Sequence, residues 1–157
     1  MIIAPTLDPV YKNVKGRYIR ILDTTLRDGE QMPGISLKPI QKLEIALALE
    51  ELGVDSIEAG FPITSPGEFE SVKMIAREIT SAEVIALARS VKEDIDKVVD
   101  TDTDAIHLFI ATSDIHMKYK LRLSPQQVIE KATTAVEYAK AHGLVTVSYT
   151  HLRAHET

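Results

Sequence analysis

Residues 18–31 read YIRILDTTLRDGEQ. The first six of these residues, Tyr18–Asp23, predict a β-strand, because tyrosine, isoleucine and leucine fit a half-buried pleated surface. The loop that follows carries an arginine, acidic side chains and a glutamine within nine residues. Gathering so much charge where a strand ends is costly unless a ligand or a metal ion uses it. The stretch therefore predicts a functional site at the carboxyl end of a buried strand.

The composition is that of one soluble globular domain. Of the 157 residues, 45% are hydrophobic and 26% are charged, which is ordinary for such a domain. The formal net charge is −5 and no long basic run is present, so we expect no nucleic-acid partner. The absence of cysteine excludes disulfides and thiolate metal ligands. Residues 1–15 lack the apolar core of a signal peptide or a membrane span, so we expect a cytoplasmic protein without a membrane partner.

Strand-like and helix-like segments alternate along the rest of the chain. The further expected strands are Val54–Ala59, Glu83–Ala88, Ala105–Ala111 and Leu144–Tyr149, and the expected helices are Ser36–Gly53, Pro66–Ile79, Lys92–Asp100 and Ser124–His142. In the first helix, Ser36 is the expected N-cap, Pro39 suits the first turn and Gly53 ends the helix. Strands that alternate with helices over short connections demand a parallel sheet.

Two parallel architectures fit this alternation, an open doubly wound sheet and a closed β/α barrel. The first strand lacks the glycine-rich turn of a dinucleotide-binding sheet. Charged residues end or follow successive strands, as Arg27, Asp28, Glu58 and Arg89 do, and a barrel collects such positions around one mouth. We therefore predict an α/β fold, the N-terminal half of a (β/α)8 TIM barrel, with about four βα units and a fifth strand.

A complete barrel needs about 250 residues, so the sequence predicts a fragment. We expect three parts: residues 1–17 form an N-terminal arm, residues 18–147 form a partial catalytic barrel, and residues 148–157 form a tail that is not native sequence.

Three segments carry a resemblance to a known family. They are Asp23–Gln31 (DTTLRDGEQ), Ile57–Pro62 (IEAGFP) and His107–Leu121 (HLFIATSDIHMKYKL). The first resembles the N-terminal signature of the 2-isopropylmalate, homocitrate and citramalate synthase family, and the other two resemble its second-strand and fourth-strand motifs. Residues 109–116 are most similar to the 2-isopropylmalate synthase branch, with the homocitrate and citramalate branches as close alternatives.

The resemblance implies an acyltransferase (EC 2.3.3.-) that condenses acetyl-CoA with a 2-oxo acid on a metal-binding barrel. The favoured oxo acid is 2-oxoisovalerate, which would place the enzyme in leucine biosynthesis, and the family is usually dimeric. A proton leaves the acetyl methyl group, the carbanion attacks the ketone carbon, and the thioester is hydrolysed. A divalent cation (Mg, Mn or Zn) would act as a Lewis acid on the ketone, and oxygen and imidazole ligands suit such a cation.

Residues of the first motif take family roles by position. Asp28 is the expected metal ligand, and its alternative reading is a loop aspartate that caps a turn. Arg27 is expected to bind the oxo acid and to stabilise the negative charge that develops on the ketone oxygen, and its alternative is an ion pair with Asp23 or Glu30. Gln31 is expected near the oxo acid and the metal, and its alternative is a solvent-facing amide.

On the fourth strand, His107 is expected to contact the oxo acid inside the barrel, with a satisfied core histidine as the alternative. Thr112 and Ser113 either hydrogen-bond substrate or cap the next turn. His116 is read as an exposed or structural loop residue.

Two acidic residues have supporting roles. Glu30 is read as structural or as a residue behind the site. Glu58 needs a partner if its carboxylate is buried, and the candidates are Arg27 and Arg89.

The tail departs from the family pattern from about Thr146 onward and is similar to translated sequencing-adapter text. His151 and His155 are four residues apart, a spacing found in zinc-binding helices, but Leu152 stands where a metalloprotease has glutamate. The family's His-x-His ligand pair and its catalytic glutamate are not in this chain, so we expect the fragment alone to be inactive and prone to aggregate.

Other readings remain open from the residues alone. A metal-dependent lyase resembling 3-hydroxy-3-methylglutaryl-CoA lyase shares the Thr-Leu-Arg-Asp-Gly chemistry but cleaves a carbon–carbon bond. A non-catalytic half barrel completed by a partner chain is a second alternative.

Overall fold

The computed structural model describes residue 16 and residues 18–149. Of the predicted arm, residues 1–17, the structure describes only residue 16. Of the predicted tail, residues 148–157, it describes only residues 148 and 149, so His151 and His155 lie outside the described residues. Among the described residues, no helix is both long enough and apolar enough to cross a membrane.

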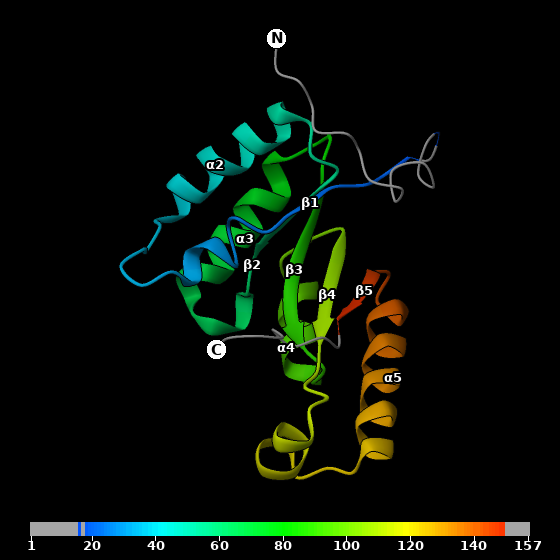
Figure 1. The fold of residues 1–157 in the computed structure, drawn as a ribbon. Coiled ribbons are helices and arrows are strands. Elements are labelled where there is room, and N and C mark those ends of the chain that lie inside the picture. The colour runs from blue at the N-terminus through cyan, green and yellow to red at the C-terminus, as the bar shows by residue number, and fades with distance from the viewer. Residues whose placement is uncertain (1–15, 17, 150–157) are drawn as a thin grey trace, which may run out of the picture.

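The five strands form one parallel sheet in the order of the sequence (Figure 1). They are β1 (Leu22–Asp23), β2 (Ser56–Gly60), β3 (Glu83–Arg89), β4 (Ala105–Phe109) and β5 (Val145–Tyr149). Each strand pairs in parallel with the next one along the chain. This is the order of a barrel wall and not of a doubly wound sheet, whose strand order reverses at a switch point. The predicted α/β fold, the amino-terminal portion of a TIM barrel, is confirmed.

The connections contain four longer helices and three short helical turns. The helices are α2 (Pro39–Leu52), α3 (Pro66–Glu78), α4 (Lys92–Val99) and α5 (Pro125–Ala141), and the turns are η1 (Gly29–Gln31), η2 (Pro62–Thr64) and the π-helical η3 (His116–Leu121). The longer helices match the expected ranges to within three residues at each end. The π-helix was not expected, because six residues are too few for hydrophobic periodicity to reveal a helix.

The start of α2 corrects the prediction that Ser36 is its N-cap. The N-cap is Lys38, whose backbone is extended (ψ 154°) and whose N–H donates to Gln41 Oε1 over 2.9 Å. Pro39 explains the difference, because the residue before a proline is driven out of the helical region. The serines that precede α3 and α5 do cap: Ser65 and Ser124 accept N–H hydrogen bonds from the third residue after each.

The first strand is also shorter than predicted. Only Leu22–Asp23 pairs with β2, whereas the sequence predicts a strand from Tyr18. The chain opposite is not yet a strand, because β2 begins at Ser56. Instead, the N–H of Ile21 donates to Asp55 Oδ2 over 2.7 Å, and its carbonyl accepts from the backbone N–H groups of Asp55 and Ser56, at the start of β2.

The core lies between the helices and the sheet. Many of its fully or almost fully buried side chains come from β2, β4, α3 and α4: Ile57, Ile106, Leu108, Val72, Ile75, Ile95 and Val98. Neighbouring helices touch in sequence order, α2 with α3 and α4 with α5. The core thus fixes the strands, and their carboxyl ends present the loops that carry the site.

Carboxylates tie neighbouring units together at the opposite, amino end of the sheet. Asp104 Oδ2 accepts from the N–H of Val84 over 2.8 Å. Glu50 Oε1, at the end of α2, accepts from the N–H groups of Thr80 and Ser81 over 2.7 and 2.6 Å. Interactions at this end of a barrel support stability more than chemistry.

The Glu50 contacts predict acid sensitivity. Hydrogen bonds from the backbone of Ser81 and Thr80 and from the Ser81 hydroxyl lower the pKa of Glu50. A carboxyl whose folded pKa is depressed contributes stability above its unfolded pKa and loses it as the pH falls through the folded value. We expect the urea midpoint to fall between pH 6 and pH 3, and to fall less in Glu50→Gln. Glu44→Gln, at an exposed position of the same helix, is the control; equal pH dependence in all three proteins would contradict this role.

Candidate active site at the carboxyl ends of the strands

A buried carboxylate joins two of the predicted site residues. Glu58 of β2 is fully buried. Its Oε2 accepts from Nε and Nη2 of Arg27, each over 2.7 Å, and its Oε1 lies 2.7 Å from Nδ1 of His107 on β4. An ionised carboxylate can only accept hydrogen bonds, so Nδ1 of His107 carries the proton in this contact. Glu58 therefore fixes the orientation of a guanidinium and an imidazole at the same end of the sheet.

Asp28 lies on the other side of Arg27. Arg27 Nη1 donates to Asp28 Oδ1 over 3.1 Å, and 47% of the Asp28 side chain is exposed against 18% for Arg27. The turn that presents both residues is wound around one carbonyl: Thr24 O accepts from the N–H groups of Arg27, Asp28 and Gly29. Leu26, fully buried, anchors this turn in the core. The aspartate thus keeps an accessible carboxylate while its neighbour is held in place.

The ion-pair partners of Arg27 in the described part of the structure are Glu58 and Asp28, and not Asp23 or Glu30. Asp23 instead accepts from the N–H and the hydroxyl of Thr25. The alternative reading thus named the wrong partners for the ion pair, because the carboxylate of Glu58 on β2 lies within reach of Arg27 once β1 and β2 pair.

Arg89 does not share the Glu58 carboxylate, which corrects the other candidate pairing. Its Nε and Nη2 donate to the two carboxylate oxygens of Asp94, each over 2.7 Å, and its backbone N–H donates to Asp94 as well. This pair closes the turn between β3 and α4. The hydrogen bonds that Arg89 donates to Asp94 raise the pKa of Arg89, although burial opposes this.

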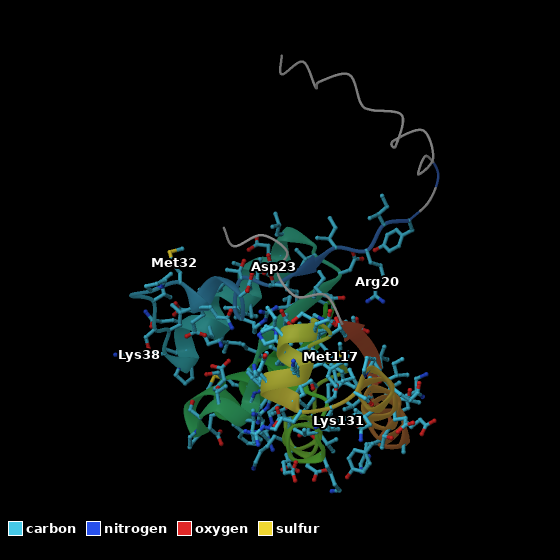
Figure 2. The ribbon with its side chains drawn as sticks, turned by 60° about the horizontal axis from the view of Figure 1, so that its bottom comes forward. Arg20, Asp23, Met32, Lys38, Met117 and Lys131 are labelled. Atoms are coloured by element: carbon cyan, nitrogen blue, oxygen red, sulfur yellow. The ribbon has the colours of Figure 1, made fainter. Side chains whose placement is uncertain are left out.

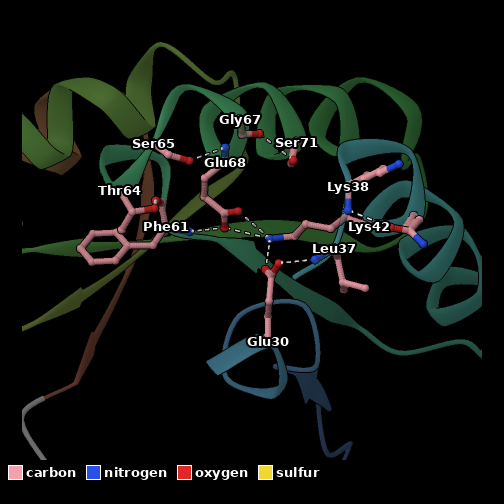
Figure 3. A network of polar contacts seen from close by, with 11 residues as sticks. Glu30, Leu37, Lys38, Lys42, Phe61, Thr64, Ser65, Gly67, Glu68 and Ser71 are labelled. Carbon is pink, nitrogen blue, oxygen red and sulfur yellow. Dashed lines mark hydrogen bonds and ion pairs between the residues drawn. The ribbon is translucent and has the colours of Figure 1, made fainter. Parts of the chain in front are cut away.

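Behind the first loop lies a second network, drawn in Figure 3. Lys42 of α2 donates to Glu30 of the loop and to Glu68 of α3, with distances of 2.8–2.9 Å. Burial of Glu30 acts to raise its pKa, but hydrogen bonds from Lys42 and from the N–H of Leu37, with the Lys42 charge, leave the pKa below its ordinary value. The structural reading of Glu30 is thus supported by its contacts.

An open cleft lies between the two loops that follow β1 and β2, with room for about 230 Å³. Its lining consists of Arg27, Glu30, Gln31, Phe61, Thr64, Ser65 and Glu68. Two predicted oxo-acid contacts, Arg27 and Gln31, therefore face one space. His107 is connected to the lining of the cleft through Glu58, which also pairs with Arg27. Asp28 is connected to the lining through its ion pair with Arg27.

Ion pairs join four carboxylates in and behind the cleft to two cations. Within the described residues, Asp28 and Glu58 pair with Arg27, and Glu30 and Glu68 pair with Lys42. Within residues 18–149, no group of three or more acidic or imidazole side chains stands ready to hold a metal ion. Asp28 can therefore supply one ligand from this part of the chain, and further ligands would have to come from elsewhere.

In the segment after β4, the hydroxyl of Ser113 has a structural role. Ser113 Oγ lies 2.8 Å from Nδ1 of His116, and its carbonyl accepts from the N–H of Met117. Ser113 therefore contacts the first residue of the π-helix, whose N-cap is Ile115 (the yellow helix near the Met117 label in Figure 2). His116 was expected in a loop; it lies in this helix as an exposed residue with a structural contact.

Comparison with known proteins places the chain. Residues 18–157 match the family described as HMGL-like. The chain belongs to the HMGL-like family. Its fold is shared with an HMG-CoA lyase of Bacillus subtilis at a TM-score of 0.70 and 19% identity, over 84% of this chain and 46% of that one. A lyase of Pseudomonas aeruginosa aligns similarly, with a TM-score of 0.69, 22% identity and coverage of 84% and 45%.

Curated members of the HMGL-like family are more similar in sequence. A probable 2-isopropylmalate synthase of Ignicoccus hospitalis is 63% identical over 131 residues, which are 83% of this chain and 33% of that protein. The 2-isopropylmalate synthase of Sulfolobus acidocaldarius is 55% identical over 85% of this chain and 35% of that protein. The (R)-citramalate synthase of Methanocaldococcus jannaschii is 57% identical over 81% of this chain and 26% of that protein. The chain thus spans between a quarter and about a third of these relatives.

Two residues of this candidate site were missed by sequence reasoning, Lys42 and Glu68. Lys42 had a detectable signal, since it lies four residues before Ala46 and seven before Leu49, on the stripe that a helix buries. A lysine on an apolar stripe predicts a buried partner. No comparable signal marks Glu68, which lies in the first turn of α3, where acidic residues are common for helix-dipole reasons alone.

Proposed function

We propose that this chain is the amino-terminal part of the catalytic barrel of an enzyme that condenses acetyl-CoA with a 2-oxo acid, with 2-oxoisovalerate as the favoured acceptor. The names of the similar curated proteins support the condensing class. They include a citramalate synthase at 57% identity, so homocitrate and citramalate synthesis stay as alternatives for the substrate. The parent protein is proposed to be a cytoplasmic homodimer, with residues 18–147 as its barrel portion.

One observation carries the proposal: Glu58 holds Arg27 and His107 in fixed orientations beside the accessible carboxylate of Asp28. A bound 2-oxo acid presents a carboxylate and a ketone oxygen, both of which need positive charge or hydrogen-bond donors. Arg27 supplies a planar fork of donors, and it cannot swing away without leaving Glu58 as a buried unpaired charge.

Each residue has a role that its contacts allow. A divalent cation held by Asp28 would supply Lewis-acid polarisation of the ketone. Arg27 is proposed to stabilise the negative charge that develops on the ketone oxygen, since preorganised donors act most strongly where charge appears. Gln31 is proposed to orient the oxo acid through its neutral amide in the cleft. His107, held through Nδ1 by Glu58, is proposed to contact the oxo acid from β4.

The assay that tests the proposal measures CoA thiol release by the complete gene product. The protein is incubated with acetyl-CoA, Mg²⁺ and, in turn, 2-oxoisovalerate, pyruvate and 2-oxoglutarate. We expect release above background, fastest with 2-oxoisovalerate. Absence of release with every oxo acid, together with cleavage of 3-hydroxy-3-methylglutaryl-CoA, would replace the proposal with a lyase. The 157-residue chain alone is expected to give no release above background.

Asp28→Asn is expected to lower kcat/KM of the complete enzyme by at least about 100-fold, because a neutral amide is a weaker ligand for a hard cation. Raising the Mg²⁺ concentration should recover part of the loss. Asp114→Asn, at an exposed position after β4, is the matched control and should leave kcat/KM unchanged. Wild-type activity in Asp28→Asn would remove Asp28 from the metal site.

A further inference from the structure

Lys42 is the largest fully buried side chain in the described part of the structure, and it carries a charge. Its relative exposure is 0%. Nζ lies 2.9 Å from Glu30 Oε2 and 2.8 and 2.9 Å from the two carboxylate oxygens of Glu68 (Figure 3). A buried ammonium is tolerated only where its charge and its donors are matched, and these two carboxylates match them.

Each of the two carboxylates also accepts a hydrogen bond from the backbone of a different loop. Glu30 Oε1 accepts from the backbone N–H of Leu37, where the chain leaves the loop after β1 and approaches α2. Glu68 Oε1 accepts from the backbone N–H of Phe61, in the turn directly after β2. One ammonium therefore links the loop that holds Asp28 and Gln31 to the loop that forms the facing wall of the cleft.

The backbone of β2 is shaped to allow this approach. Gly60 has φ +156°, and a Cβ at this position would lie 2.0 Å from Glu68 Oε1. Only glycine lets the Glu68 carboxylate reach both Lys42 and the Phe61 N–H. The connection thus depends on four separate chain segments, η1, α2, the end of β2 and α3.

We propose that Lys42 is a positioning residue, a buried clamp that sets the separation of the two loops and so the placement of Arg27 and Gln31 across the cleft. The inference rests on the proposed function for its consequence, because the cleft matters only if it binds the oxo acid. The effect of Lys42 on the separation of the two loops can be tested without substrate or metal.

Amide hydrogen exchange of the complete gene product tests the clamp directly. The reporters are the N–H groups of Leu37 and Phe61, which the two carboxylates accept, and the N–H groups of β3 report global opening. In Lys42→Met we expect exchange at Leu37 and Phe61 to accelerate at least ten-fold more than exchange in β3. The NMR resonance of the Arg27 Nε–H should also shift, although the hydrogen bonds of the Lys42 ammonium go to Glu30 and Glu68 and not to Arg27.

Lys73→Met is the matched control for removal of a lysine. Lys73 lies on α3, is partly exposed and donates to the carbonyl of Asp100. In this variant the Leu37, Phe61 and Arg27 signals should keep their wild-type values.

Glu30→Gln keeps the test decisive if Lys42→Met fails to fold. The amide leaves the Lys42–Glu68 pair in place, so exchange at Leu37 should accelerate while exchange at Phe61 should not. Equal acceleration of Leu37, Phe61 and the β3 amides in the folded variants would overturn the proposal, because Lys42 would then contribute general stability alone. A condensation assay that fails while these exchange results hold would reject the proposed function and leave the clamp intact.

Discussion

Glu58→Leu is expected to destabilise the chain by about 3–5 kcal/mol, the cost of breaking a buried ion pair by removing one partner. Leucine would fill the volume of the glutamate and would leave the Arg27 guanidinium without its buried partner. His107 would lose the acceptor of its Nδ1–H at the same time. A urea unfolding curve measures the change in the free energy of unfolding.

Glu58→Gln separates charge from shape in the same experiment. The amide oxygen can still accept from Arg27, but its NH₂ group cannot accept from Nδ1–H of His107, so we expect an intermediate loss. Glu83→Gln is the control, since Glu83 pairs with the exposed Arg20 and such surface pairs contribute about 0–1 kcal/mol. If Glu58→Leu cost no more than Glu83→Gln, Glu58 would not be the residue that holds the site together.

Gly60→Ala is the second substitution with a large expected effect, about 2–5 kcal/mol of destabilisation. The added Cβ would lie 2.0 Å from Glu68 Oε1 and 3.0 Å from Val72 Cγ2, and φ +156° is strained for any residue with a side chain. Glu68 could yield only by giving up its hydrogen bonds to Lys42 and Phe61. The substitution therefore acts on both the backbone and the clamp.

Gly67→Ala is the matched control for the added methyl group. Gly67 lies in the first turn of α3, and the nearest atom to a Cβ there is Ser65 Oγ at 3.9 Å. Alanine is favoured over glycine in a helix by roughly 0.5–1 kcal/mol, so Gly67→Ala should be neutral or slightly stabilising. If the two substitutions changed the free energy of unfolding in urea equally, the close approach at Gly60 would not contribute to stability.

The sequence predicted those parts of the fold that depend on local pattern. The strand–helix alternation, the stop of α2 at Gly53 and the starts of α3 and α5 at Pro66 and Pro125 each follow from residues within one element. The errors lie where a neighbouring segment decides: β1 is short because β2 begins late, and the N-cap moved to Lys38 because of Pro39.

Long-range pairing limited what could be predicted of the site. A partner for Glu58 was expected, but the choice between Arg27 and Arg89 depended on which arginine had a closer carboxylate. Arg89 finds one only five residues away, at Asp94. The contact of His107 with Glu58 joins residues 49 positions apart, and no period within a single sequence encodes such a pair.

Asp28 is proposed to bind a divalent cation beside the guanidinium of Arg27. Anomalous diffraction from crystals of the complete enzyme soaked with Mn²⁺ and 2-oxoisovalerate measures this directly. We predict one manganese peak at coordination distance, about 2.0–2.3 Å, from a carboxylate oxygen of Asp28, with the oxo acid in contact with Arg27. A peak at other residues, with Asp28 turned away from the ion, would contradict the proposed chemistry.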